Sequence, residues 1–429
     1  MARLIIFLVS YTVLIPFYYL NIQMLEGFSL LFKYLPFLCI LFVAVLGFLK
    51  DEIHINAENR IVLMFSVFVF VVSLISLTDS IFIFFGFAKF VYYSVTGLGF
   101  FVLLCIYRPD IRTNYRRVLI ALVLVSSISS AYGICVYLTG VDWLWGPTSL
   151  FFSPYNGWMG RGDVIRPPFL FGNSLYAGSY FSMVLPFSIL LFLHSKRVEQ
   201  KILFALTCLL LVGGLIVSFA RGAIIATFIV TILQFVFHMN GWEKAKKRIA
   251  ISIVLSSLCV FALLFTYSDS IFFERISDRF ALLKDIQQHE PYRISQFYTT
   301  LKILKEEPFL GVGFGNFVKN YDELRSSSTP EGYNSKTTEN MYLMTLCETG
   351  ILGLVAFFTL IGSTVADMLK NRKIILSKYN RDYNYAIICS IVSCLIIMCT
   401  WDVLNQPSIR LLFWLVMGLG IKNISGLKR

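Results

Sequence analysis

The stretch TTENMYLMTLCETGILG, residues 337–353, ends a long polar segment and begins a long apolar one. The apolar character continues to residue 365, and a run of this length can cross a membrane as a helix, because about 20 residues span the hydrocarbon core. Glu339 and Asn340 stand at the start of the run, and a second acid, Glu348, lies inside it. The stretch therefore predicts a membrane helix that begins at a pair of polar residues.

The whole chain has a composition that agrees with this local pattern. Of its 429 residues, 57% are hydrophobic and only 14% are charged, whereas a soluble globular protein carries about 25% charged residues. The apolar residues fall into long blocks that short charged patches separate. We therefore expect an all-α, polytopic helical integral membrane protein and exclude a soluble protein with a buried core.

The apolar blocks predict twelve membrane spans in a single transmembrane domain that comprises residues 1–429. The expected spans are 4–22, 29–49, 61–79, 84–106, 118–139, 171–193, 202–219, 222–238, 249–267, 341–365, 384–401 and 409–421. The first has no small-residue cleavage site after its apolar run, so we expect a retained span and not a removed signal peptide.

The basic residues assign the connecting segments to two sides of the membrane. Lysine and arginine concentrate near 1–3, 50–60, 108–117, 196–201, 244–248, 370–381 and 422–429. The short loops of the other side, at 21–28, 80–83 and 402–408, contain none. The positive-inside rule then places both termini in the cytoplasm. Because the net charge of +12 is distributed over such loops, it does not indicate a nucleic-acid partner.

Two long segments fall on the outer side. Residues 140–170 form one outer loop, rich in Trp, Pro and Gly, and residues 268–340 form a larger one. Within the larger loop, PYRISQFYTTLKILKEE at 291–307 has apolar residues at helical spacing, which predicts helices lying on the outer membrane face.

Arginines in separate outer segments border the membrane spans. Arg221 lies in the turn SFARGAII, Arg293 in EPYRISQFY, and Arg161 and Arg166 lie before the sixth span. A guanidinium binds a phosphate through two parallel hydrogen bonds, so several arginines in separate outer segments suggest a basic pocket for a polyanion. The simpler interpretation is that such arginines reach lipid head groups at the interface.

Other chemistry has little support in the sequence. The glycine-rich GVGFGNF at 311–317 lacks a following GK[ST] and indicates close backbone approach, not nucleotide binding. No HExxH occurs, and His289 is the only histidine that the topology places outside, so we expect no metal and no cofactor. The nine cysteines lie within apolar runs without a CxxC pair, and we interpret them as small buried hydrophobes.

Three segments together resemble the bacterial O-antigen polymerase and O-antigen ligase superfamily over roughly residues 160–365. SFARGAIIA resembles its S-x-x-R-G-A turn, and RPPFLFGNSLYAGSYF is similar to its R-x-x-x-x-F-x-N segment. RISQFYTTLKILKEEPFLGVGFGNF followed by ENMYLMTLCETGILGLVAFF resembles its signature region.

The resemblance implies an inverting, metal-independent glycosyltransferase of the helical membrane architecture known as C-type. Such enzymes use undecaprenyl-diphosphate-linked glycans as donor and acceptor on the periplasmic face of the bacterial inner membrane. Polymerases build O-antigen, capsule or exopolysaccharide from repeat units, and a chain-length-regulating co-polymerase is a plausible partner there. Ligases transfer the glycan to lipid A core, and relatives transfer it to protein. A lipid-linked glycan flippase is the competing class, but we find no inverted repeat in the sequence.

The resemblance also assigns roles to particular residues. Arg221 and Arg293 would bind the donor diphosphate, and Arg161, Arg166, Asn173, Asn340 and Tyr342 would contact substrate. Glu339 stands where ligases have a histidine that is proposed to activate the acceptor hydroxyl, which favours a polymerase.

Two acids leave alternatives open. Glu339 could act as the general base, hold an arginine in an ion pair, or bind the acceptor sugar, and His289 is a reserve candidate for the base. We interpret Glu348 as an intramembrane acid that is tied to another helix.

Overall fold

The computed structural model describes residues 37–42, 44–45, 60–77, 83–106, 112–139, 167, 169–171, 173–239, 291–319, 321–324, 337–370 and 378–425. Within these ranges every regular element is a helix and no strand occurs. The all-α prediction is therefore confirmed for this part of the chain.

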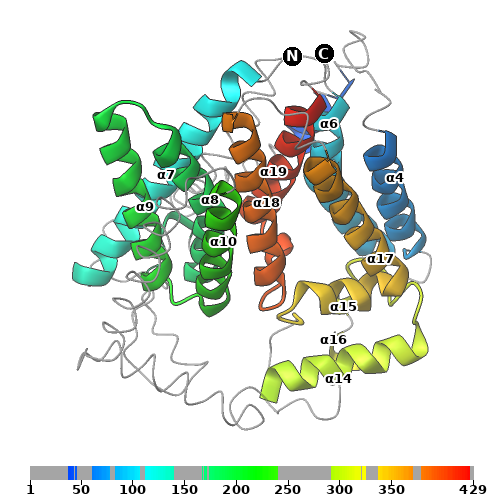
Figure 1. Cartoon of the computed structure of the whole chain (residues 1–429). Coiled ribbons are helices and arrows are strands. Elements are labelled where there is room, and N and C mark those ends of the chain that lie inside the picture. Colours follow the sequence, from blue (N-terminus) through cyan, green and yellow to red (C-terminus); the bar gives the residue numbers. More distant parts are fainter. Residues whose placement is uncertain are drawn as a thin grey trace.

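Long apolar helices form a bundle (Figure 1). They are α4 (Arg60–Ile75), α5 (Ile83–Tyr93) continuing through η3 (Ser94–Gly99) into α6 (Phe100–Ile106), α7 (Arg112–Thr139), α8 (Ser174–His194), α9 (Val198–Val217), α10 (Arg221–Met239), α17 (Met341–Lys370), α18 (Lys378–Met398) and α19 (Pro407–Ser425). Seven described helices are long and apolar enough to cross a membrane, and Val62–Ile75 and Pro407–Ile421 are shorter apolar helices. The chain is a polytopic helical membrane protein.

The count of twelve spans is not established. The predicted spans 4–22 and 249–267 lie outside the described residues, and the span 29–49 is described only as helical residues at 37–42 and 44–45. The remaining predicted ranges coincide with the helices named above to within a few residues. Residues 140–166 of the first outer loop, and residues 268–290, 320 and 325–336 of the second, also lie outside the described part.

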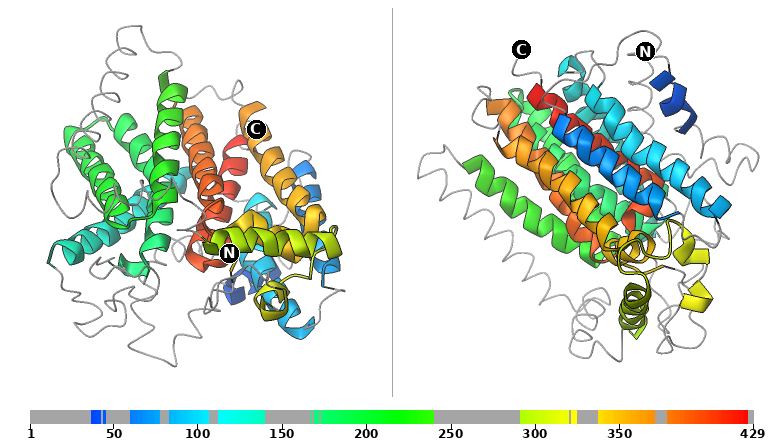
Figure 2. Two further views of the ribbon diagram at one scale, coloured as in Figure 1. Left: turned by 90° about the horizontal axis from the view of Figure 1, so that it is seen from below. Right: turned by 90° about the vertical axis from the view of Figure 1, so that its right-hand side faces the viewer.

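Successive helices run alternately up and down the bundle. The start of α17, the end of α18 and the starts of α8, α10 and α19 lie at one end, which α14 (Pro291–Glu306) crosses (Figures 1 and 2). We refer to this as the α14 end. The alternation agrees with the predicted topology, in which these helix ends share one side of the membrane.

Small hydroxyl residues join the central helices. Ser182 of α8 and Ser393 of α18 lie 2.6 Å apart between their Oγ atoms, and Thr227 Oγ1 of α10 donates to Ser182 Oγ at 2.8 Å. All are buried. Hydrogen-bonded small residues let helix backbones approach closely where both neighbours and lipid are apolar. α8, α10 and α18 therefore form a closely packed trio.

The α14 end carries a layer of helices across the bundle. α14 packs against α17, and it is followed by α15 (Asn316–Lys319) and α16 (Tyr321–Leu324). Gln296 Nε2 of α14 donates to the hydroxyl of buried Tyr321 at 2.7 Å. Phe297 and Tyr298 on α14 are about half exposed, at 49% and 51%. The expected helix at 291–307 is confirmed, and its exposed aromatic residues suit a membrane interface.

A break in α17 receives the glycine-rich segment. At Gly350 the backbone has φ 63° and ψ −165°, which interrupts the helix. The N–H groups of Ile351 and Leu352 donate instead to the carbonyls of Pro308 and Phe309, at 3.0 and 3.3 Å. On the other side of the break, Val312 N–H donates to the carbonyl of Cys347 at 2.8 Å. The backbone groups released by the break are thus satisfied inside the protein, as membrane depth requires.

Replacing Gly350 by alanine is expected to destabilise the fold by about 1–3 kcal/mol, because this backbone conformation is almost confined to glycine. An added Cβ would also overlap the Phe309 carbonyl. Thermal unfolding in detergent measures the effect. Gly362→Ala in the same helix is the matched control, because a Cβ there meets no atom within 4 Å. An unchanged unfolding temperature for Gly350→Ala would contradict the interpretation of the break.

Candidate functional site

An ion pair between two sequence-predicted residues stands at the α14 end. Arg293 Nε, in the first turn of α14, lies 3.3 Å from Glu339 Oε2. Glu339 is 6% exposed and has φ 49°, an uncommon conformation for a residue with a side chain. Its N–H donates to Thr337 Oγ1 at 3.3 Å. The arginine side chain is 43% exposed, so the pair presents a reachable cation and a buried carboxylate.

Asn340 and Tyr342 connect the start of α17 to α18. Asn340 Oδ1 accepts from the N–H groups of Tyr342 and Leu343 at 2.9 and 3.2 Å and so caps α17. Asn340 Nδ2 donates to the Cys399 carbonyl at 3.0 Å, and the Tyr342 hydroxyl donates to the Leu395 carbonyl at 2.7 Å. Their predicted substrate contacts remain predictions, and the described contacts of both residues position the helix.

Arg221 lies beside the same end of α18. It is half-buried at the start of α10, and the next residue, Gly222, packs so closely on Thr400 that a Cβ would overlap it. Asn340 binds the neighbouring carbonyl of Cys399. Arg221 and Asn340 therefore flank the same turn of chain, although they come from segments far apart in the sequence.

Asn173 has a structural contact at this end. Its Oδ1 accepts from Leu175 N–H at 2.8 Å and caps α8. In the first turn of α8, Tyr176 packs on Trp401, with ring centroids 6.2 Å apart. The structure therefore places Asn173 in the same region as Arg221. Two further predicted residues, Arg161 and Arg166, and the reserve base His289 lie outside the described residues.

A cavity of about 280 Å³ opens next to the ion pair. Aromatic, amide and charged side chains line it: Lys89, Tyr93, Tyr176, Val318, Thr337, Trp401, Asp402, Asn405 and Gln406. Thr337, which also accepts the Glu339 N–H, connects the cavity wall to the ion pair. Its size is close to the lower limit for small-molecule pockets, and its mixture of aromatic walls and a few polar groups is typical of them.

A second ion pair supports the cavity wall. Lys89 Nζ of α5 lies 3.0 Å from Glu348 Oε1 of α17, and both side chains are largely buried. Lys89 also approaches the rings of Tyr93 and Phe314 at 5.6 and 5.8 Å. The expectation that Glu348 is tied to another helix is confirmed. Lys89 was not among the predicted site residues, although a lysine within an apolar run is itself a signal of function or pairing.

Arg410 is another cation that was not predicted as a site residue. It lies in the first turn of α19, is 2% exposed, and stacks on Tyr93 at 3.9 Å from the ring centroid. Its Nη1 donates to the Leu404 carbonyl at 3.0 Å, and its Nε and Nη2 have no hydrogen-bond partner among the described residues. Because Tyr93 and Asn405 line the cavity, Arg410 adds positive charge behind its wall.

Asp402 supplies a buried acid to the cavity. It is 4% exposed, and Asn405 Nδ2 donates to its Oδ2 at 2.6 Å. Burial raises the pKa of this carboxyl above its ordinary value, although the Asn405 hydrogen bond and the charge of Lys89 act in the opposite direction.

The raised pKa of Asp402 predicts a pH-dependent contribution to stability. The folded state holds the proton more tightly than the unfolded state, so the stabilisation is present at low pH and is lost as pH rises from the ordinary pKa through the raised one. As pH rises above the ordinary carboxyl pKa of about 4, Asp402→Asn should therefore gain stability relative to wild type. Thermal unfolding of both proteins at a series of pH values tests it. A difference that does not change with pH would contradict it.

The chain is similar to one known family over the region that holds these residues. Residues 205–358 match the O-antigen ligase family. The match includes Arg221, Arg293, Glu339 and the α17 break, and it confirms the resemblance to the O-antigen polymerase and ligase superfamily. No curated protein matches the chain significantly.

Proposed function

We propose that the protein is a glycosyltransferase that polymerises undecaprenyl-diphosphate-linked oligosaccharide repeat units on the outer face of the bacterial inner membrane. The observation that carries the proposal is the Arg293–Glu339 pair, which lies beside a cavity at one end of a membrane-helix bundle. A cation for a diphosphate and a carboxylate for a hydroxyl are the two groups that glycosyl transfer from a lipid diphosphate needs.

The donor diphosphate would bind the arginines. Arg221 and Arg293 lie at the same end of the bundle, and Arg293 is exposed enough to reach a ligand. As the bond between the anomeric carbon and the diphosphate oxygen breaks, that oxygen keeps the electron pair, and the guanidinium groups stabilise the developing charge. Because the arginines supply this stabilisation, the proposed reaction is independent of metal.

The acceptor hydroxyl would attack from the opposite side of the anomeric carbon and invert it. A new carbon–oxygen bond forms, and the hydroxyl proton passes to the carboxylate of Glu339. The adjoining cavity suits the sugar that carries this hydroxyl, since Trp401 and Tyr176 offer flat apolar faces and Asp402 and Asn405 offer hydrogen bonds. Thr337 lines the cavity and accepts the Glu339 N–H, so a sugar bound in the cavity would lie next to the proposed base.

A ligase that transfers the glycan to lipid A core or protein is the second candidate. The name of the matching family, O-antigen ligase, favours it. The carboxylate at position 339, where the family's ligases have histidine, favours the polymerase. The two reactions share the donor and differ only in the molecule that takes up the glycan.

The test uses purified protein with synthetic undecaprenyl-diphosphate-linked repeat units, with lipid A core present or absent. We expect elongation of the lipid-linked repeats, and we expect it to persist in EDTA. Glycan on lipid A core without any elongation would identify a ligase instead. Loss of elongation in EDTA that Mg²⁺ restores would contradict the metal-independent reaction, because Mg²⁺ is the usual partner of diphosphates.

A further inference from the structure

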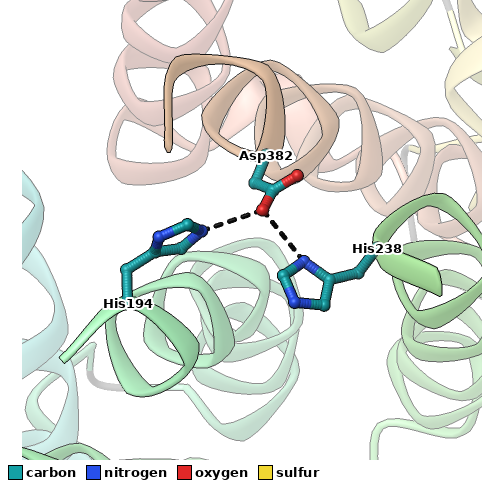
Figure 3. A group of neighbouring side chains, drawn as sticks. All are labelled: His194, His238 and Asp382. Atoms are coloured by element: carbon teal, nitrogen blue, oxygen red, sulfur yellow. Dashed lines mark hydrogen bonds and ion pairs between the residues drawn. The ribbon is translucent and has the colours of Figure 1, made fainter. Parts of the chain in front are cut away.

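Two histidines and an aspartate meet at the end of the bundle away from α14. His194 is the last residue of α8, His238 lies in the last turn of α10, and Asp382 lies in the first two turns of α18. His194 Nε2 and His238 Nδ1 both face the same oxygen, Asp382 Oδ2, at 2.9 and 3.0 Å (Figure 3). The three ligand atoms lie within 4.8 Å of one another. All three side chains are largely buried, at 19%, 9% and 6% exposure.

The space beside this cluster has the size of a single water molecule or ion. A cavity of about 10 Å³ is lined by His238, Asp382 and Gln234, together with two leucines and Tyr385. Gln234 Nε2 donates to the Pro186 carbonyl at 2.8 Å, which fixes the orientation of the amide. Its Oε1 is buried and has no hydrogen-bond partner among the described residues. The cavity therefore contains an acceptor that a bound water would satisfy.

The donor atoms suit a transition metal. Two imidazole nitrogens and one carboxylate oxygen form a ligand set that Zn²⁺ uses, and nitrogen ligands disfavour Mg²⁺ and Ca²⁺. Ligand atoms around a tetrahedral Zn²⁺ lie about 3.3 Å apart, so the two nitrogen–oxygen separations need to open by only a few tenths of an ångström. The two histidine nitrogens, which lie within 4.8 Å of each other, would turn toward a common ion. The imidazole hydrogens that now point at Asp382 would move to the other ring nitrogens.

We propose that His194, His238 and Asp382 bind one divalent ion of the zinc class, with a water as fourth ligand that donates to Gln234 Oε1. The space is too small for a substrate, and the site is at the opposite end from the cavity of the proposed reaction. Its role is structural. The ion would join α8, α10 and α18 at this end of the bundle. At their other ends, α8 begins after Asn173, α10 begins at Arg221, and α18 is followed by Cys399, whose carbonyl accepts from Asn340.

The test uses the full chain, purified in detergent without a histidine tag and stripped with a chelator. After dialysis against Zn²⁺ alone, we expect about one bound ion per chain, and an apparent unfolding temperature several degrees higher than that of the stripped protein. Co²⁺ in place of Zn²⁺ should give the strong visible absorption of a four-coordinate ion. Wild-type protein that binds neither ion stoichiometrically would overturn the proposal.

Variants locate the ion. His194→Gln and His238→Gln keep a side-chain donor that can reach Asp382, so each protein should fold, and each should lose most of the bound ion and the rise in unfolding temperature. His54→Gln removes a histidine elsewhere in the sequence and should change neither. Full occupancy in the His194→Gln/His238→Gln double variant would overturn the assignment. Metal content and unfolding do not depend on the reaction, so this result is separate from the proposed function.

Discussion

Arg293→Ala is expected to lower the turnover of glycan transfer by roughly 10²–10³-fold, because it removes a preorganised cation from the leaving diphosphate. Arg293 is positioned for this role, since it pairs with Glu339 and its side chain is still 43% exposed. Arg293→Lys should recover only part of the activity, because an ammonium keeps the charge but lacks the planar fork that binds two phosphate oxygens. Initial rates with the synthetic donor measure both variants.

The control for Arg293→Ala is Lys305→Ala. Lys305 is an exposed cation near the end of the same helix, so its loss changes the net charge equally but leaves the ion pair intact. We expect it to retain wild-type rates. Arg221→Ala should resemble Arg293→Ala if both bind the diphosphate. Near-normal turnover in both arginine variants, with normal amounts of folded protein in the membrane, would show that the diphosphate binds elsewhere.

The membrane helices could be predicted because their physical cause is local. A run such as 171–193 is apolar over a length that fits the bilayer, and α8 indeed extends over Ser174–His194. The α17 break at Gly350 was not predicted, and the sequence indicated close backbone approach only at the glycine-rich segment 311–317. The geometry of the break depends on carbonyls of Pro308 and Phe309 that meet Ile351 and Leu352 from another segment. Such a pairing has no local signal in the sequence.

The site was predicted only as far as its motifs extend. Arg293 and Glu339 were recognised because each lies in a family motif, and the structure brings them together. Lys89 and Asp402 were missed because each is a single charge in an apolar or short connecting segment. Lys89 and Glu348 are 259 positions apart in the chain. Only the folded arrangement, in which Lys89 of α5 meets Glu348 of α17, reveals that the lysine has a partner and lines a cavity.

The histidine cluster was missed for a related reason. The predicted topology placed His194 and His238 on the same side of the membrane. Two residues on the same side need not be in contact. Their contact depends on Asp382, which is 188 positions from His194 and lies on a helix that packs between α8 and α10. A metal-binding motif of fixed spacing can be recognised in a sequence, whereas ligands from separate helices cannot.

Glu339→Gln is expected to reduce turnover by about 10²–10⁴-fold, the usual contribution of a general base. The substitution keeps the shape of the side chain, and the amide oxygen can still accept from Arg293 Nε, so donor binding should change little. The loss should therefore fall on kcat and not on the KM for the donor. Glu306→Gln, at the exposed end of α14, is the matched control and should retain wild-type rates.

The pH profile separates the base from a mere ion-pair partner. If Glu339 accepts the proton, wild-type turnover rises with pH as the carboxyl ionises, and this rise disappears in Glu339→Gln. If Glu339 only holds Arg293, the variant keeps both its turnover and the rise. The proton must then go to another carboxylate, and Asp402 is the next group to test, because it lines the adjoining cavity and burial raises its pKa toward that of a useful base. In that case Asp402→Asn, and not Glu339→Gln, removes the rise with pH.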